Sequence, residues 1–268
     1  MKKIITITAL FLFGIQLMQA QMDERFYYPS KKMAKIDLSN FKEVNYTIDK
    51  DTITSLVFTS QKEKAKATVL YFHGAGGNVS SYVKFVQPLI EDNFNVIMVD
   101  FRGYGKSSGK PTHLNIASDA QIIFNDVIKN PQFKNQKILI YGVSMGTQVA
   151  TNLAKNNQSK IDGLILDGCI SSFTDIAADS SPKEQQQMIQ QYLTSPYSPK
   201  EDIKTITNLP ILFIHSREDK SVPISHQETV FNNAISPKKS LWVYTGDHIM
   251  APVDHKEEFV RRINSILK

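Results

Sequence analysis

The stretch Tyr141–Gln148, YGVSMGTQ, decides how this chain is interpreted. It follows the apolar run KILI and precedes the helix-like run VATNLAK, so Ser144 stands where a strand turns into a helix. A residue on such a sharp turn has a strained backbone, and glycine at positions 142 and 146 avoids clashes of flanking side chains. The N–H groups that open the following helix would face the serine. We therefore expect Ser144 to be held out where it can react, the alternative being a glycine-rich turn with a spectator serine.

Apolar runs and amphipathic segments alternate from about residue 67 to the end of the chain. Continuous apolar runs such as ATVLYFHG and FNVIMVD are typical of strands buried on both faces. Segments such as SSYVKFVQPLIEDN have the apolar stripe of a helix. This alternation predicts right-handed βαβ units, and thus an α/β fold with a mostly parallel sheet and helices on both faces. Ahead of it, FKEVNYTID and TITSLVFTS alternate apolar and polar residues and predict two antiparallel strands at a sheet edge.

Residues 168–209 interrupt this regular alternation. They contain the Gln-rich segment SSPKEQQQMIQQYL and the turn-rich segment TSPYSPKED between two predicted strands. The interval is too long for a plain connection, so we predict a helix plus a small lid over one end of the sheet. The length of 268 residues suits one large domain, and we predict a single α/β domain over residues 21–268.

The first twenty residues have the layout of a secretory signal peptide. Lys2 and Lys3 precede the uncharged run IITITALFLFGIQL, and MQA follows, which places the expected cut after Ala20. The apolar run is about 14 residues long, whereas a spanning helix needs about 20. We therefore expect an exported protein, periplasmic or secreted, with no stable membrane anchor after cleavage. An uncleaved N-terminal anchor is the minor alternative.

Composition excludes several classes of protein. Hydrophobic residues make up 41% and charged residues 21%, which is ordinary for a globular chain and too apolar for a disordered one. The net charge of +5 falls by two when Lys2 and Lys3 are removed, and the other basic residues are scattered, so no nucleic-acid partner is expected. The six histidines show no metal-binding spacing, and we predict neither a metal nor a cofactor. Cys169 is the only cysteine, so no internal disulfide can form.

A serine nucleophile needs a base to take its proton and an acid to orient that base. In an open parallel sheet, functional side chains follow the carboxyl ends of the strands. The segment ILFIHSREDKSVP places Asp219 just after one predicted strand, and LWVYTGDHIMAP places His248 just after the last. The chain order Ser, Asp, His is that of a nucleophile-elbow site. We predict Ser144 as the nucleophile, His248 as the base and Asp219 as the acid.

Other residues could fill these roles less well. Glu218 comes one residue too early to share the direction of Asp219, and Asp247 is expected to be a loop-capping neighbour of the base. Asp167 ends the strand before the lid and ranks below Asp219 as a substitute acid. Among the other histidines, His113 is expected in a loop before the helix that starts near Leu114. The remaining histidines are predicted to be ordinary surface or core residues: His73, His215, His226 and His255.

Acyl transfer also requires donors for the oxyanion, and the loss of one donor typically lowers the rate by about 10²–10³-fold. The loop YFHGAGGNVSSY has four small residues, Gly74 to Gly77, that let the backbone approach a ligand. We assign the two donors to the backbone amides of Ala75 and Met145, with His73 bracing the loop. The segment DFRGYGKSSG lacks the spacing of a P-loop and is interpreted as a structural turn beside the site.

The segments HGAGGN, DFRGYGKSSG, GVSMG, HSREDKSVP and GDHIMAP occur in a familiar order and spacing. With them the chain resembles the α/β-hydrolase-fold serine hydrolases over roughly residues 45–268. It is most similar to the branch with serine aminopeptidase-like and depalmitoylase-like proteins. The resemblance implies a mostly parallel eight-stranded sheet with helices on both faces and a short lid insertion. It implies the same three catalytic residues and the same two oxyanion donors.

Two departures from the family pattern lie close to the predicted site. His215-Ser216 stands where the family usually has His-Gly, and Thr147 follows the elbow where another small residue is common. Depalmitoylase-type relatives carry an N-terminal cysteine cluster, which this chain lacks, so protein depalmitoylation is not expected.

The sequence thus favours an exported serine hydrolase that cleaves carboxylic esters through an acyl-enzyme. The short lid favours small or medium acyl chains. A peptidase or amidase on the same residues is the alternative, and Asp175 and Asp179 of the lid are its candidate carboxylates for a substrate amino terminus. A non-catalytic binding protein on this fold is a third possibility. An aspartate-nucleophile hydrolase is excluded because the elbow carries Ser144.

Overall fold

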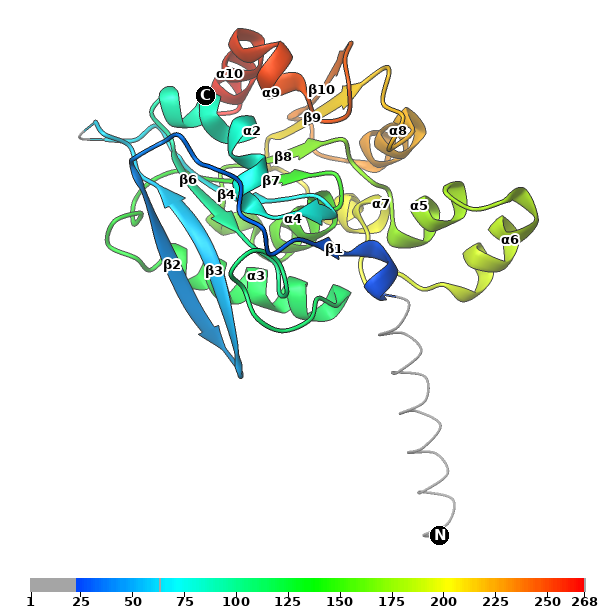
Figure 1. The fold of residues 1–268 in the computed structure, drawn as a ribbon. Coiled ribbons are helices and arrows are strands. Elements are labelled where there is room, and N and C mark those ends of the chain that lie inside the picture. Colours follow the sequence, from blue (N-terminus) through cyan, green and yellow to red (C-terminus); the bar gives the residue numbers. More distant parts are fainter. Residues whose placement is uncertain (1–22, 63, 268) are drawn as a thin grey trace, which may run out of the picture.

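The computed structural model describes residues 23–62 and 64–267 (Figure 1). The predicted signal peptide, residues 1–20, lies outside the described residues. No helix within residues 23–62 and 64–267 has the length and apolar character needed to cross a membrane.

A central sheet of eight strands forms the core, in the order β10-β9-β8-β7-β4-β6-β3-β2 (Figure 1). Adjacent strands from β10 to β6 pair in parallel, and β3 runs against its two neighbours. The predicted α/β-hydrolase sheet is therefore confirmed. The strands are β2 (Phe41–Ile48), β3 (Asp51–Phe58), β4 (Thr68–Phe72), β6 (Asn95–Val99), β7 (Ile138–Val143), β8 (Gly163–Asp167), β9 (Ile211–Ser216) and β10 (Lys239–Tyr244).

Burial explains the two kinds of strand pattern. Every residue of β4, β6, β7, β8 and β9 is buried, which is why these segments are continuous apolar runs. The edge strand β2 is largely exposed or half-buried, in keeping with its alternating pattern. Its partner β3 is almost wholly buried because it also pairs with β6.

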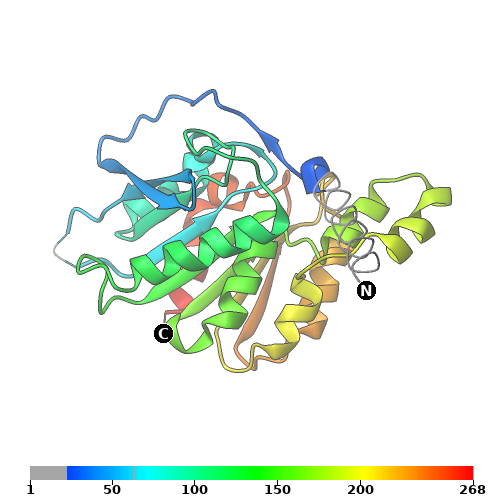
Figure 2. The same ribbon diagram turned by 90° about the horizontal axis from the view of Figure 1, so that it is seen from below.

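Helices cover both faces of the sheet (Figure 2). One face packs against α3 (His113–Val127), α4 (Gly146–Asn156) and α8 (Ile224–Asn233). The other packs against α2 (Val79–Glu91), α9 (Ala251–Asp254) and α10 (Lys256–Ser265). The short helix α7 (Pro199–Asp202) contacts α4 and α8. Single 3₁₀ turns occur at η2 (Gln158–Lys160) and η3 (Ile203–Thr205).

Side-chain caps set the starts of two of these helices. Asn78 caps α2 and Thr112 caps α3, each in a reciprocal capping box with the residue three positions on. His113 is consequently the first residue of α3, and the prediction that it lies in a loop was wrong by one residue.

Within residues 168–209, an arm projects beside the carboxyl end of the sheet (Figure 1). It holds α5 (Phe173–Asp179) and α6 (Lys183–Tyr192), which pack against each other, before the chain returns through α7. No residue of α6 is buried, so its polar, Gln-rich sequence meets solvent on most sides. The arm has more helix than the single one expected, because the sequence of α5 is too short to show a helical period.

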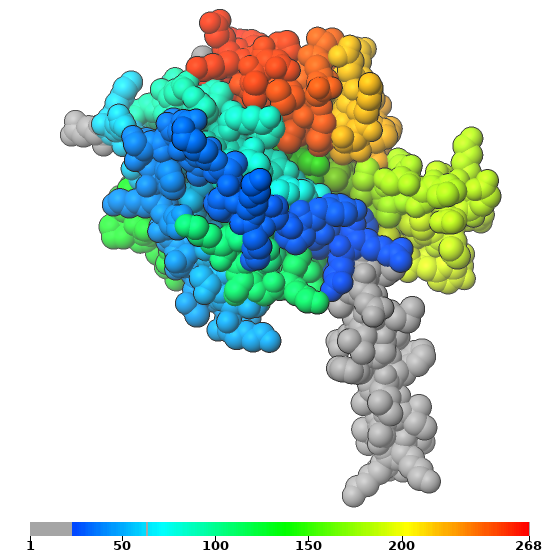
Figure 3. All heavy atoms as spheres, in the orientation of Figure 1, coloured from blue at the N-terminus to red at the C-terminus, as the bar shows by residue number. Residues whose placement is uncertain are grey.

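The N-terminal segment crosses the front of the molecule on the way to β2 (Figure 3). It begins with η1 (Glu24–Phe26), and β1 (Tyr28–Pro29) then pairs in parallel with β5 (Gly76–Gly77). The small-residue loop after β4 thereby gains a strand partner from the start of the chain.

Candidate active site

Ser144 lies on a strained turn between β7 and α4. Its φ of 51° falls in the left-handed region, which a serine adopts only where its surroundings force it. Its N–H donates to Asp167 O at 2.8 Å, which ties the turn to the end of the next strand. A Cβ at Gly142 would lie 2.5 Å from Gly146 O, and one at Gly146 would collide with the Phe72 carbonyl. The two glycines are thus required by close packing.

Thr147, one of the two departures from the family pattern, reinforces this turn. Its hydroxyl donates to Ser144 O at 2.6 Å and accepts the N–H of Ile170 at 3.3 Å. It therefore joins the start of α4 to the loop after β8. The larger residue is accommodated because its polar atom is satisfied on both sides.

Asp219 and His248 form the second part of the site. The carboxylate Oδ2 of Asp219 is 2.5 Å from His248 Nδ1, and its Oδ1 accepts the N–H groups of Ser221 and Val222 at 2.8 Å. Burial opposes the charge of Asp219, yet the hydrogen bonds from His248 and the two amides leave its pKa below the usual value. The Asp219 side chain is 1% exposed and that of His248 is 19% exposed, so the imidazole alone reaches solvent.

The loops after β8 and β9 bring His248 toward the elbow. A Cβ at Gly168, where φ is 59°, would lie 2.6 Å from His248 Cε1, so the imidazole rests on a residue that must be glycine. The neighbouring residue, Asp167, accepts the N–H of Ser144. Ser144 Oγ and His248 Nε2 are not hydrogen-bonded to each other, as is common in enzymes without substrate.

The second departure, Ser216, supports the loop that carries His248. The Ser216 hydroxyl donates to Gly246 O and accepts the N–H of Glu218. Glu218 in turn accepts the N–H of Gly246 at 3.1 Å, which turns its carboxylate toward the loop. Both side chains therefore connect the acid loop to the base loop, and Glu218 is not placed as Asp219 is.

The backbone amides of Ala75 and Met145 flank Ser144. A Cβ at Gly74, next to Ala75, would lie 3.3 Å from Ser144 Cβ. Within the described residues, neither the Ala75 nor the Met145 amide donates a hydrogen bond. His73 Nδ1 donates to Gly74 O at 2.7 Å, and burial lowers the pKa of His73 to about 4, so its ring is a neutral brace. Two free donors thus adjoin the serine, as an oxyanion hole requires.

A cavity of about 510 Å³ opens beside Ser144. Its walls come from the N-terminal segment, the elbow and the arm, and Ala75, Met145 and Ser221 also line it. Apolar side chains predominate in these walls: Phe26, Ile170, Phe173, Ile176, Met188, Ile189, Leu193 and Val222. No acidic residue lines it among those described. Phe26 and Tyr28 could not be found from sequence, because an aromatic pair near the start of the chain has no distinguishing pattern.

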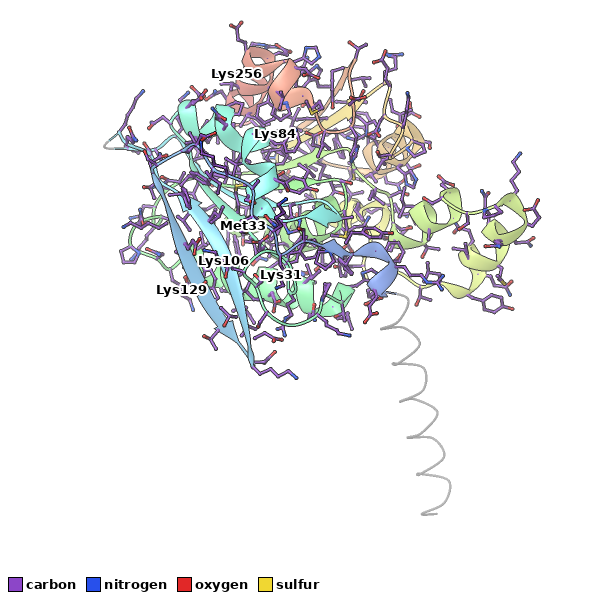
Figure 4. The ribbon with its side chains drawn as sticks, in the orientation of Figure 1. Lys31, Met33, Lys84, Lys106, Lys129 and Lys256 are labelled. Carbon is purple, nitrogen blue, oxygen red and sulfur yellow. The ribbon has the colours of Figure 1, made fainter. Side chains whose placement is uncertain are left out.

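A second cavity, of about 440 Å³, lies on the His248 side. Ser221 lines both cavities, so the two meet at the loop that carries Asp219. Lys84 and Lys220 also line it, and Figure 4 labels Lys84 on α2. Ser144 and His248 therefore face two adjoining spaces of different character.

Asp167, the substitute acid, is buried beneath the site. Burial raises its pKa to about 7, although His248 and the Tyr141 hydroxyl, which donates to it at 3.1 Å, act against that rise. The structure pairs Asp219, and not Asp167, with His248. The described residues include no cluster of three His, Cys, Asp or Glu side chains suited to a metal ion.

A second serine–histidine contact, which the sequence did not indicate, joins the base of the arm to α8. Ser171 Oγ is 2.8 Å from His226 Nδ1, and His226 Nε2 is 3.0 Å from Asp179 Oδ2. Ser171 Oγ also donates to Asp175 at 2.6 Å, and Asp175 pairs with Lys200. Neither Ser171 nor His226 lines the two cavities.

Comparison with known proteins is consistent with this geometry. The sequence profile of the family described as "Serine aminopeptidase, S33" matches residues 63–199, about half of the chain. The chain belongs to this family. Protein bem46 of Schizosaccharomyces pombe is 32% identical over 195 residues, covering 72% of this chain and 65% of that protein. The uncharacterized protein YfhR of Escherichia coli O157:H7 is 29% identical over 272 residues, covering 99% and 94% of the two chains.

Solved structures share the fold of this family member. The esterase Pf2001 of Pyrococcus furiosus superposes with a TM-score of 0.71 over 90% of this chain and 98% of that one. Its sequence identity to this chain is 19%, so the likeness shows the α/β-hydrolase fold alone.

Proposed function

We propose that this chain is an exported serine hydrolase that cleaves carboxylic esters through an acyl-enzyme intermediate. The observation that carries the proposal is the position of Ser144, which lies on a strained turn with two free amides and an apolar cavity beside it. The Asp219–His248 pair supplies the acid and the base of the proposed mechanism. Export is proposed from the signal-like pattern of residues 1–20.

In the first half-reaction, Ser144 Oγ attacks the ester carbonyl while His248 Nε2 takes its proton. Asp219 holds the imidazole through Nδ1 and stabilises the imidazolium that forms. The amides of Ala75 and Met145 donate to the oxyanion of the tetrahedral intermediate. His248 then protonates the leaving alcohol, and in the second half-reaction it activates the water that releases the acid.

The two cavities suggest where the halves of the substrate lie. The leaving oxygen must lie near His248, because that residue gives it a proton, so the alcohol is assigned to the cavity that His248 lines. The acyl group is then assigned to the apolar cavity of about 510 Å³, whose walls include Phe26, Ile176 and Leu193. Apolar walls stabilise an acyl chain in proportion to the area they bury. We propose esters with medium-length acyl chains as the substrate class.

A peptidase that binds a free amino terminus fits the site less well. Such an enzyme needs a carboxylate at the cleft, and the residues lining the acyl cavity include Arg25 but no acid among those described. The two lid acids are engaged elsewhere, since Asp175 pairs with Lys200 and Asp179 approaches His226. The non-catalytic alternative is disfavoured because Ser144 lines the cavity and His248 is hydrogen-bonded to Asp219.

The proposal is tested by turnover of p-nitrophenyl esters, from acetate to palmitate, by residues 21–268. The matched variants are Ser144→Ala and Ser171→Ala, which remove the hydroxyls of the two histidine-associated serines. We expect a maximum at medium chain length, wild-type rates for Ser171→Ala and no turnover by Ser144→Ala. Aminoacyl p-nitroanilides, measured beside the esters, should react far more slowly. Turnover that survives Ser144→Ala, or a preference for the anilides, would contradict the proposal.

A further inference from the structure

The N-terminal strap, defined as residues 27–34, is joined to the loop that carries Ala75 (Figure 3). The Tyr28 N–H donates to Ala75 O at 2.9 Å, and the Ser30 N–H donates to Gly77 O at 2.9 Å. Asn78, the cap of α2, donates through its side-chain amide to Ser30 O and Lys32 O at 2.9 Å. The strap thus extends the loop by one short strand and fixes both of its ends.

Tyr104 links the strap and the loop to the turn DFRGYGKSSG. Its buried hydroxyl donates to Ala75 O at 2.5 Å and accepts the N–H of Tyr28 at 3.0 Å. One residue on, the Gly105 N–H donates to Ser30 O at 3.0 Å. A side chain at Gly105, where φ is 47°, would collide with Asp100, so the tight turn requires glycine there. The turn that sequence alone marked as structural therefore contacts the proposed oxyanion loop directly.

These contacts fix the direction of the Ala75 amide. In a trans peptide the N–H points opposite to the preceding carbonyl. That carbonyl, Gly74 O, accepts from His73 on one side. The following carbonyl, Ala75 O, accepts from Tyr104 and Tyr28 on the other. With both flanking carbonyls bound, the Ala75 N–H is left free and cannot rotate away without breaking a hydrogen bond.

We propose that Tyr104 and the N-terminal strap are a positioning device that aims the Ala75 amide at the oxyanion. The inference rests on the proposed function, because it concerns a donor used only in the transition state. Tyr104 neither lines the cavity beside Ser144 nor hydrogen-bonds to Ser144, so it acts through its contact with Ala75. Such a role lowers kcat with little effect on KM, since the affected hydrogen bond strengthens as the oxyanion forms.

The test compares Tyr104→Phe with Tyr197→Phe in residues 21–268. Tyr197 is also buried and its hydroxyl donates to His113 O at 2.9 Å, so its loss has a similar structural cost away from Ala75. For Tyr104→Phe we expect kcat on a medium-chain p-nitrophenyl ester to fall about 10–100-fold, below the full cost of one lost donor, with KM within about threefold. The affinity for a trifluoromethyl ketone, which forms an oxyanion on Ser144, should fall in parallel. Tyr197→Phe should leave both values near wild type.

A variant on the protein surface, Lys31→Ala, tests the same inference without removing a buried side chain. Lys31 is an exposed residue of the strap, labelled in Figure 4. Its Nζ donates a hydrogen bond to Ser107 O at 2.6 Å. Lys31→Ala should lower kcat by a smaller factor with an unchanged melting temperature. Wild-type kcat in Tyr104→Phe, or equal losses in Tyr104→Phe and Tyr197→Phe, would overturn the inference while leaving the esterase proposal intact. Absence of Ser144-dependent turnover in the wild type would overturn both.

Discussion

The molecule holds two sets of serine, histidine and aspartate side chains, one around Ser144 and one around Ser171. In the Ser144 set, His248 binds Asp219 through Nδ1 and keeps Nε2 free of hydrogen bonds to the described residues. In the Ser171 set the ring is reversed, with Nδ1 beside the serine and Nε2 beside Asp179. In each set the histidine lies within hydrogen-bonding range of another member, 2.5 Å from His248 to Asp219 and 2.8 Å from His226 to Ser171. Residue types and short contacts alone therefore do not distinguish the sets.

Their surroundings do distinguish them. Ser144 has a positive φ, partial exposure and two free amides nearby, whereas Ser171 is buried and shares its hydroxyl with Asp175. His226 is likewise buried, and burial lowers its pKa. The Ser171 set connects the arm to α8 and stabilises structure. A catalytic set therefore needs an approach for substrate and donors for the developing charge, beyond its three side chains.

The largest expected difference is between the two histidines. His248→Ala should lower kcat/KM for esters by about 10⁴-fold or more, because the nucleophile loses its base. His226→Ala should leave kcat/KM within a few-fold and lower the free energy of unfolding by about 1–3 kcal/mol, since buried polar partners lose their hydrogen bond. Steady-state kinetics and denaturant unfolding of both variants measure this. Equal activity losses would show that the sets are not functionally different.

The two aspartates should separate in the same way. Asp219→Asn should reduce kcat by about 10³–10⁴-fold with little change in fold, because the amide favours the wrong imidazole tautomer. Asp179 is 47% exposed at its side chain, so Asp179→Asn should keep kcat near wild type. The measurement is kcat of both variants on one ester, with circular dichroism as the folding control. Activity retained by Asp219→Asn would shift the role of acid to Asp167.

The stability contributed by Asp167, near Ser144, and by Asp175, beside Ser171, should depend on pH with opposite signs. Burial raises the pKa of Asp167 to about 7, so the folded state holds a proton that the unfolded state releases above about pH 4. Stability from this group is present at low pH and is lost as pH rises toward 7. Burial opposes the charge of Asp175 too, but hydrogen bonds from Lys200 and Ser171 lower its pKa to about 2. The stability that Asp175 contributes is therefore present near neutral pH and is lost as pH falls.

This difference is measurable by unfolding at pH 4 and pH 8. Asp167→Asn should be less destabilised, relative to wild type, at pH 8 than at pH 4, by on the order of 1 kcal/mol for each pKa unit of the shift. Asp175→Asn should show nearly the same loss at pH 4 and pH 8, because the stability that Asp175 contributes falls only below about pH 4. The same pH response in both variants would contradict the assignment of charge to the two sites.

The smallest effect is expected at Ser171. Ser171→Ala removes a hydroxyl that Asp175 and His226 share, so we expect about 1–2 kcal/mol of lost stability. Ester turnover at saturating substrate should change by less than about twofold, because the arm keeps its apolar contacts. A thermal melt and a single kinetic run suffice. A large loss of turnover without a change in melting temperature would place Ser171 in the active site.

Much of the fold followed from local sequence patterns. The buried strands are continuous apolar runs because both faces of the sheet are covered, and the edge strand β2 keeps its alternation because it is largely exposed. The need for glycine at positions 142 and 146 could be predicted, because a Cβ at either position would collide with backbone atoms. These features depend on neighbours in sequence or on one adjacent strand, which is why a pattern could reveal them.

Contacts between distant segments could not be predicted in this way. The strap meets the proposed oxyanion loop through β1 and β5, two-residue strands too short to have a period. Tyr104 and Ala75 are joined by a single hydroxyl, and nothing in the segment around either residue indicates the other. The second set around Ser171 was missed for the same reason, because His226 lies 55 positions away in the chain.

The most direct test of the central claim is to label residues 21–268 with a fluorophosphonate and to locate the modified residue by mass spectrometry. The reagent reports which serine is activated, whatever the natural substrate is. The account predicts one modified residue, Ser144, with labelling abolished in Ser144→Ala and His248→Ala and retained in His226→Ala. Modification of Ser171, or a wild-type protein that stays unlabelled, would contradict it.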